Sequence, residues 1–212
     1  MKKYIIASAV LVFAVAVQSC NTESKKETTT TMDGMNNKDS MRKDQTNMEP
    51  MHNMNGMKMT GDFDYDFANT MVTHHQSAVD MAKNVLVKGS NADVKTMAQN
   101  IVTAQEAEIA QFKSILKDYK MPEMKKDAGE AHNELGETME KMETKMNGIT
   151  KTGNADKDFL MMMIPHHESA VTMGEDELSH GKNLELKKMA QKIMEDQSKE
   201  IKQFEAMLAK MK

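Results

Sequence analysis

The sequence predicts an all-α protein: a duplicated αα-hairpin forming a four-helix bundle, with an extra connecting helix and a disordered N-terminal tether. Aromatic residues make up 4% of the 212-residue chain and Trp is absent, which suits a helical core better than a β-sandwich. Beyond residue 61, apolar residues recur at three- and four-residue steps, the period of an amphipathic helix. Most specifically, Met71-x-x-His74-His75-x-x-Ala78-x-x-Met81 recurs 92 residues later as Met163-x-x-His166-His167-x-x-Ala170-x-x-Met173.

The N-terminus resembles a bacterial lipoprotein signal. Lys2 and Lys3 precede an apolar run, and Cys20, the single cysteine, follows it. Residues 1–20 are therefore predicted to be a signal peptide whose Cys20 is lipidated; an ordinary secretory signal with a chance cysteine is the alternative. We expect an extracytoplasmic protein anchored to a bacterial membrane. Asn21, which is not a retention aspartate, favours the outer membrane, facing the periplasm or the surface.

Residues 21–61 are predicted to be a disordered Met- and Thr-rich tether. The segment contains no Val, Ile, Leu or aromatic residue, so it cannot bury enough surface to offset the entropy of ordering. Exposed Met has no packing role, and Met-x-x-Met spacing lets several thioethers wrap one soft ion. We interpret the segment as a metal-capture region rather than a linker of biased composition. Its candidate ligands are Met48, Met51, His52, Met54, Met57 and Met59.

Residues 62–212 are predicted to form the bundle. Repeat one spans 62–120, the connector 121–153 and repeat two 154–212. Within each repeat, a Gly- and Asn-containing break separates two helices, as at Gly89-Ser90-Asn91 and Gly181-Lys182-Asn183. The connector carries a weakly apolar helix ending near Asn147, which we place outside the four main helices.

The repeated motif gathers imidazoles and thioethers on one helical stripe. At about 100° per residue, its two His, two Met and one Ala fall within about 120°. Imidazole with thioether suits Cu(I), and several imidazoles suit Cu(II). The candidate metal ligands are Met71, His74, His75, Met81, Met163, His166, His167 and Met173.

The same stripe is also the width of a core-facing helix surface. Buried His is commonly a hydrogen-bonded core residue, and Met at helical spacing is commonly packing. Adjacent His residues diverge by about 100°, so at most one His of each pair should join the Met stripe at any single ion. The recurrence of the pair and the Met-rich tether favour metal binding.

Two Glu residues at matched positions, Glu108 and Glu200, could orient the imidazoles as hydrogen-bond acceptors behind the ligands; exposed helix charges are the alternative. A di-iron oxidase would need Glu-x-x-His on two helices. Glu177-x-x-His180 has that spacing, but the first repeat carries Lys88 at the position of His180. No catalytic residue stands out, and we do not expect an enzyme.

The two His-His-x-x-Ala-x-x-Met motifs, each followed by Met-Ala-x-x-Ile and Gln-x-x-Glu-Ile, resemble the domain-of-unknown-function family DUF305 over about residues 62–211. The resemblance implies a ferritin-like helical bundle, secreted or periplasmic and associated with copper handling. It implies copper binding at the eight motif residues named above.

We therefore expect an extracytoplasmic lipoprotein that sequesters or hands on copper, Cu(I) in preference to Cu(II), through Met and His ligands. Its partners would be the metal ion, the membrane through its lipid, and a copper-transfer partner or a second copy. The net charge of −4, with both signs mixed along the helices, excludes a basic face for nucleic acid. The rival hypothesis is a structural or interaction lipoprotein without metal, whose paired His are core residues.

Overall fold

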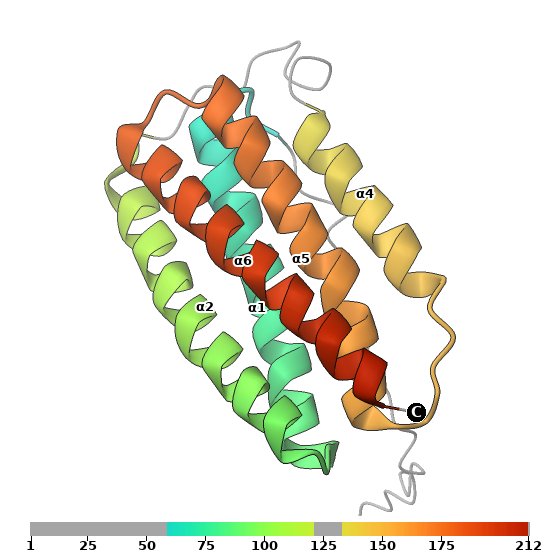
Figure 1. The fold of residues 1–212 in the computed structure, drawn as a ribbon. Helices are drawn as coiled ribbons and strands as arrows, with labels where there is room; N and C mark the ends of the chain where they lie inside the picture. Colours follow the sequence, from blue (N-terminus) through green and yellow to red (C-terminus); the bar gives the residue numbers. More distant parts are fainter. Residues whose placement is uncertain (1–58, 121–132, 212) are drawn as a thin grey trace, which may run out of the picture. The chain divides into compact units, whose positions relative to one another are not determined.

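The computed structural model describes residues 59–120 and 133–211, and every regular element in these two ranges is an α-helix (Figure 1). The predicted all-α, duplicated-hairpin fold is confirmed. Repeat one supplies α1 and α2, the connector supplies α4, and repeat two supplies α5 and α6. Their bounds are Phe63–Lys88, Ala92–Asp118, Glu134–Asn147, Ala155–His180 and Leu184–Lys210.

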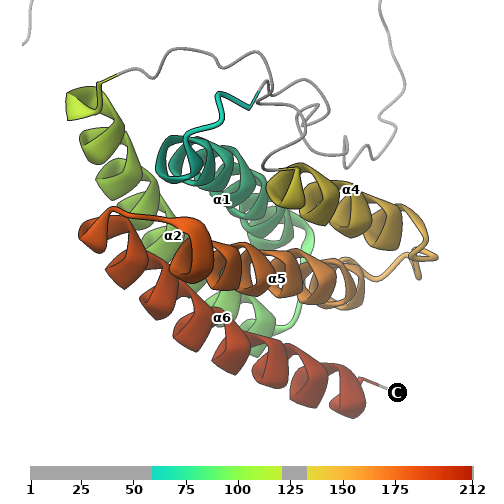
Figure 2. The same ribbon diagram turned by 90° about the horizontal axis from the view of Figure 1, so that it is seen from above.

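The two hairpins meet through their first helices. Helix α1 packs on α2, α5 packs on α6, and α1 and α5 pack on each other between the hairpins (Figure 2). Helix α4 lies against α5 and also touches α1, so it is a fifth helix beside the bundle, as predicted. This arrangement places the two repeated motifs on the central pair of helices.

The helix ends repeat with the same offset because the capping residues repeat. The side chains of Asp62 and Asn154 accept hydrogen bonds from the first turns of α1 and α5, and those of Asn91 and Asn183 do the same for α2 and α6. Such side chains satisfy backbone N–H groups that have no partner within the helix. The caps thus set the lengths of both hairpins.

Two buried aspartates tie each hairpin to the other. Asp64 on α1 accepts from the backbone N–H groups of Lys182 and Asn183, both at 2.8 Å. Its counterpart on α5, Asp156, accepts from the backbone of Ser90 and Asn91 at 2.8 and 3.0 Å. Each carboxylate serves the turn of the opposite repeat, which fixes the two hairpins relative to each other.

Contacts with the bundle begin at Thr60, two residues before residue 62, the predicted start of the bundle. Thr60 is buried, and its N–H and hydroxyl both donate to Asp66. Thr152 makes the same contacts with Asp158, and the glycine after each Thr has a positive φ of 83° or 82°. A Thr-Gly turn therefore precedes both first helices, and the repeat includes it.

The predictions for residues 1–58 and 121–132 fall on residues that the structure does not describe. They are the signal peptide with Cys20, the tether up to residue 58, and the first part of the connector, residues 121–132. Of the tether ligands, only Met59 is described, and it packs against the core. No helix in the described ranges is both long enough and apolar enough to cross a bilayer.

Candidate metal site

The four histidines of the two motifs converge at the contact between α1 and α5. All four are 0% exposed. His74 and His166 lie face to face across this contact, with ring centroids 3.8 Å apart and planes inclined by 35°. The repeat thus places one imidazole from each hairpin at the centre of the bundle.

The second histidine of each pair points to the partner helix of its own hairpin. His75 Nε2 donates to Glu108 Oε2 on α2 at 3.0 Å, and His167 Nε2 donates to Glu200 Oε2 on α6 at 2.7 Å. Within each pair the ring centroids are 6.0 and 6.1 Å apart. The hydrogen bonds expected of the two carboxylates are present, and the pairs diverge as the helical angle requires.

His74 is held by the opposite helix. Its Nε2 lies 2.8 Å from Ser169 Oγ and 3.1 Å from the carbonyl oxygen of His166. Ser169 Oγ in turn donates to the same carbonyl at 2.6 Å and lies 2.9 Å from Met142 Sδ on α4. The carbonyl can only accept, so Nε2 of His74 carries the proton and its Nδ1 carries the lone pair.

Every one of the four rings offers a nitrogen without a hydrogen-bond partner in the described ranges: Nδ1 of His74, His75 and His167, and both nitrogens of His166. Because Glu108 and Glu200 accept from Nε2, the lone pair of His75 and of His167 sits on the free Nδ1. Buried polar atoms normally have partners. A bound cation would give these unpaired nitrogens a partner.

Burial favours the neutral form of His74, His166 and His167, the form that a metal ligand requires. Burial, reinforced by the neighbouring histidines, holds the pKa of His74 and of His166 well below its ordinary value. Burial also lowers the pKa of His167, although the hydrogen bond and charge of Glu200 oppose that effect. Burial alone would raise the pKa of Glu108, but its contacts with His75 and Lys192 lower it.

The carboxylates behind the two outer histidines are not equivalent. Glu108 also accepts from Lys192 Nζ on α6 at 2.9 Å, an ion pair that joins α2 to α6. Repeat one has Asn100 at the position of Lys192. The side chain of Glu108 is 10% exposed and that of Glu200 is 21% exposed.

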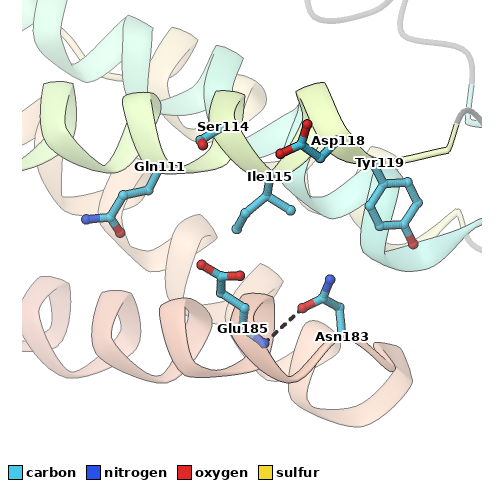
Figure 3. Close-up of a pocket in the computed structure, with 7 residues that line it drawn as sticks. All are labelled: Gln111, Ser114, Ile115, Asp118, Tyr119, Asn183 and Glu185. Carbon is cyan, nitrogen blue, oxygen red and sulfur yellow. Dashed lines mark hydrogen bonds between the residues drawn. The ribbon is translucent and has the colours of Figure 1, made fainter.

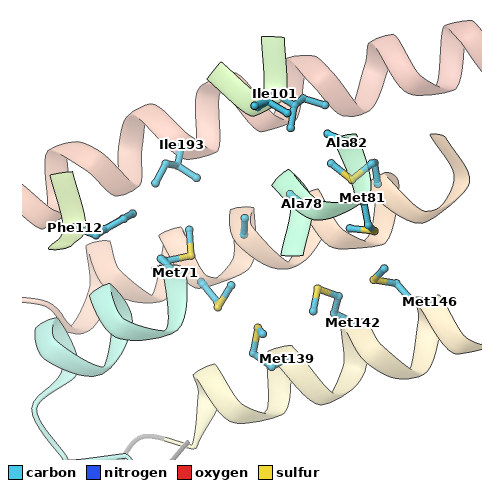
Figure 4. Close-up of a cluster of buried hydrophobic side chains, with 14 of the residues drawn as sticks. Met71, Ala78, Met81, Ala82, Ile101, Phe112, Met139, Met142, Met146 and Ile193 are labelled. Carbon is cyan, nitrogen blue, oxygen red and sulfur yellow. The ribbon is translucent and has the colours of Figure 1, made fainter. Parts of the chain in front are cut away.

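The four motif methionines are buried, and Met71, Met163 and Met173 are 0% exposed. Met71 and Met163 precede the His pairs by one helical turn, the spacing at which side chains are neighbours. Met81 lies further along α1, where α4 approaches (Figure 4). All eight motif residues are therefore buried in the bundle. Along α1 and α5, the methionines lie about one helical turn or more from the histidines.

In the described ranges, no three side chains among His, Cys, Asp and Glu are arranged to hold one ion. A cation at this cluster would have to recruit thioether sulfur as well as ring nitrogen. Two buried amides add to the polar interior: Gln105 and Gln197, each one turn before a Glu, have no side-chain hydrogen-bond partner there. Their matched positions are visible in the sequence, but an exposed amide would give the same pattern.

A surface pocket of about 390 Å³ opens elsewhere, between the end of α2 and the start of α6 (Figure 3). Tyr119, Asp118 and Ile115 line one side, and Asn183 and Glu185 line the other. It contains neither His nor Met, so it is separate from the imidazole cluster.

Comparison with known proteins identifies the family and similar helical structures. The family model described as "Domain of unknown function (DUF305)" matches residues 13–116 and 64–208. Solved structures of CopM are similar: the Cu(II)-bound form is 30% identical with a TM-score of 0.55, covering 70% of this chain and 97% of CopM. The Cu(I)-bound form is 29% identical with a TM-score of 0.53, covering 70% and 96%.

A DUF305 fragment from Deinococcus radiodurans is 25% identical with a TM-score of 0.53, covering 70% of this chain and 96% of the fragment. CopM has also been solved in a silver-bound form, which is 28% identical, has a TM-score of 0.54 and covers 69% of this chain and 95% of CopM. No curated protein matches the sequence.

Proposed function

The chain belongs to the DUF305 family, and from that premise we propose that its bundle binds copper ions at the four-histidine cluster. The observation that carries the proposal is the set of four buried imidazoles, each with a ring nitrogen that lacks a partner in the described ranges. The similarity to CopM, solved with Cu(I) and Cu(II), supports it.

Copper fits these groups chemically. Neutral imidazole nitrogen and thioether sulfur together suit Cu(I), and clustered imidazoles suit Cu(II). His74, His75, His166 and His167 would supply nitrogen, and Met71 and Met163, one turn away, would supply sulfur. By accepting hydrogen bonds from Nε2, Glu108 and Glu200 would keep the lone pairs of His75 and His167 on Nδ1. Binding would break no hydrogen bond at these ring nitrogens, because they have no partner in the described ranges.

The role we propose is sequestration or transfer of copper outside the cytoplasm, without catalysis. The anchor would be a lipid on Cys20, supported by Lys2, Lys3 and the apolar run before it. The Met-rich residues 48–59 would capture ions and the bundle would retain them. Cys20→Ser should release the protein from the membrane fraction; retention there would contradict the anchor.

Copper content after dialysis tests the bundle site in the full chain. We expect the variant with all four paired His changed to Ala to lose the bundle's copper, whereas His180→Ala, a change of an exposed His on α5, the helix of His166 and His167, should retain it. Equal copper in the quadruple variant and the wild type would refute the site.

Unfolding separates binding from the rival core hypothesis. A ligand that binds only the folded state at 100 times its Kd adds about 2.7 kcal/mol of stability. Copper should raise the Tm of the wild type by that mechanism and leave the single variant His166→Gln much less affected. If His166→Gln loses equal stability with and without copper, the histidine is a packing residue.

A further inference from the structure

We propose that α4 completes a second soft-metal site, built from thioethers alone, where it packs on α1 and α5. The site would consist of Met139, Met142 and Met146 on α4 with Met81 on α1. It would take a monovalent soft cation, Cu(I) or Ag(I). It does not rest on the four-histidine site, which uses different ligands.

The side of helix α4 that faces the bundle carries three methionines. Five of its fourteen residues are buried, and three of these are Met139, Met142 and Met146. Their spacing of three and four residues places all three on one side of a helix. Their exposed fractions are 7%, 2% and 5%, so they face the protein interior and not solvent.

The central helix α1, which faces α4, also carries methionine side chains. Figure 4 shows the side chains of Met139, Met142 and Met146 leaving α4 toward the central helices, with Met81 across from them and Met71 further along. Helix α4 contacts both α5 and α1. Four thioethers from two helices thus line one interface, and methionine side chains have enough rotatable bonds to close around an ion.

Ser169 shows that the α4 sulfur lies within polar contact of the histidine cluster. Its Oγ is 2.9 Å from Met142 Sδ and 2.8 Å from His74 Nε2. One hydroxyl therefore separates a thioether of α4 from an imidazole of α1. The two sites would be neighbours, between which an ion could pass without crossing solvent.

Thioether ligation differs from imidazole ligation in a way that can be measured. A thioether carries no proton in the physiological range, whereas an imidazole must be deprotonated to bind. Ag(I) bound at the α4 site should therefore be retained as the pH is lowered. Ag(I) bound by imidazole should be released.

The test uses Ag(I) with the full chain. Leu is close to Met in volume, and such exchanges are well tolerated in cores. We expect the triple variant Met139→Leu, Met142→Leu, Met146→Leu to bind one Ag(I) fewer than the wild type by titration calorimetry. Met189→Leu, a change of a buried Met on α6, is the matched control and should bind as many as the wild type.

A second measurement does not depend on the variant's fold. In wild-type protein labelled with ¹³C at the Met methyl groups, Ag(I) should shift the resonances of Met139, Met142 and Met146 and leave that of Met189 in place. Unshifted α4 resonances, or an unchanged Ag(I) count in a folded triple variant, would overturn the proposal. Loss of copper in the histidine variants is a separate result and bears only on the first site.

Discussion

Glu177 makes the stability of the bundle dependent on pH. It lies near the end of α5, is 0% exposed, and neither carboxylate oxygen has a hydrogen-bond partner in the described ranges. Repeat one has Val85 at this position, so in repeat two an ionisable side chain replaces an apolar one. Burial, with the added negative charge of Asp64, raises the pKa of Glu177 from 4.5 to about 8.

The sign follows from proton affinity. The folded protein holds the Glu177 proton up to about pH 8, whereas the unfolded chain releases it near 4.5. Rising pH therefore favours the unfolded state throughout that window, and stability is lost. Because each tenfold change in proton affinity is worth about 1.4 kcal/mol, the full difference would be about 5 kcal/mol. Screening by solvent and local relaxation reduce the expected loss to about 2–3 kcal/mol.

Glu177→Gln removes the ionisation and tests this reasoning. Urea unfolding at pH 5 and pH 9 should show that the variant's stability relative to the wild type improves by about 2–3 kcal/mol between the two pH values. Glu175→Gln, a change of an exposed neighbour on the same helix, should show no such improvement. A difference between Glu177→Gln and the wild type that is the same at both pH values would refute the buried-carboxyl account.

Three further changes test packing and the site. A Cβ on Gly174 would lie 2.6 Å from Met194 Cγ, so Gly174→Ala should cost about 1–3 kcal/mol in urea unfolding, and Met194→Val should restore most of it. Glu200→Ala should weaken copper binding about 10- to 100-fold in competition titrations, because the variant offers no side-chain acceptor to His167 Nε2; unchanged affinity would contradict that role. Ser169→Ala leaves buried polar groups less satisfied and should cost about 1–3 kcal/mol of thermal stability; a neutral result would show that the contact is dispensable.

The helices could be predicted from the sequence because their boundaries are marked at matching positions in both repeats. A cap at Asn91 alone is weak, but Asn91 and Asn183 at one offset, each two residues after a glycine, mark the same turn in two copies. Thr60-Gly61 falls within the predicted tether because it follows a polar, Met-rich segment. Its counterpart, Thr152-Gly153, could have revealed that the repeat begins there.

Compensating changes in side-chain volume between the two repeats could not be predicted from the sequence. Repeat one has Ala82 and Val102 where repeat two has Gly174 and Met194. The close approach of Gly174 to α6 leaves no room for a Cβ beside the longer methionine. Such volume exchange depends on which residues face each other across the helix contact, and helical period does not specify that.

In the described ranges, the contacts of the site depart from two-fold symmetry where α4 packs. Ser77 and Ser169 occupy matched positions, yet only Ser169 reaches the opposite histidine, His74, in these ranges. Met142 of α4 lies against Ser169, and no other helix in the described part of the chain packs on α1 in the same way. His74 is consequently held by Ser169 and a carbonyl, whereas both ring nitrogens of His166 are unpartnered. Two motifs of equal sequence thus hold their first imidazoles differently: in the described ranges His74 is anchored by the opposite helix, whereas His166 offers two unpartnered nitrogens to the ion that we propose the cluster binds.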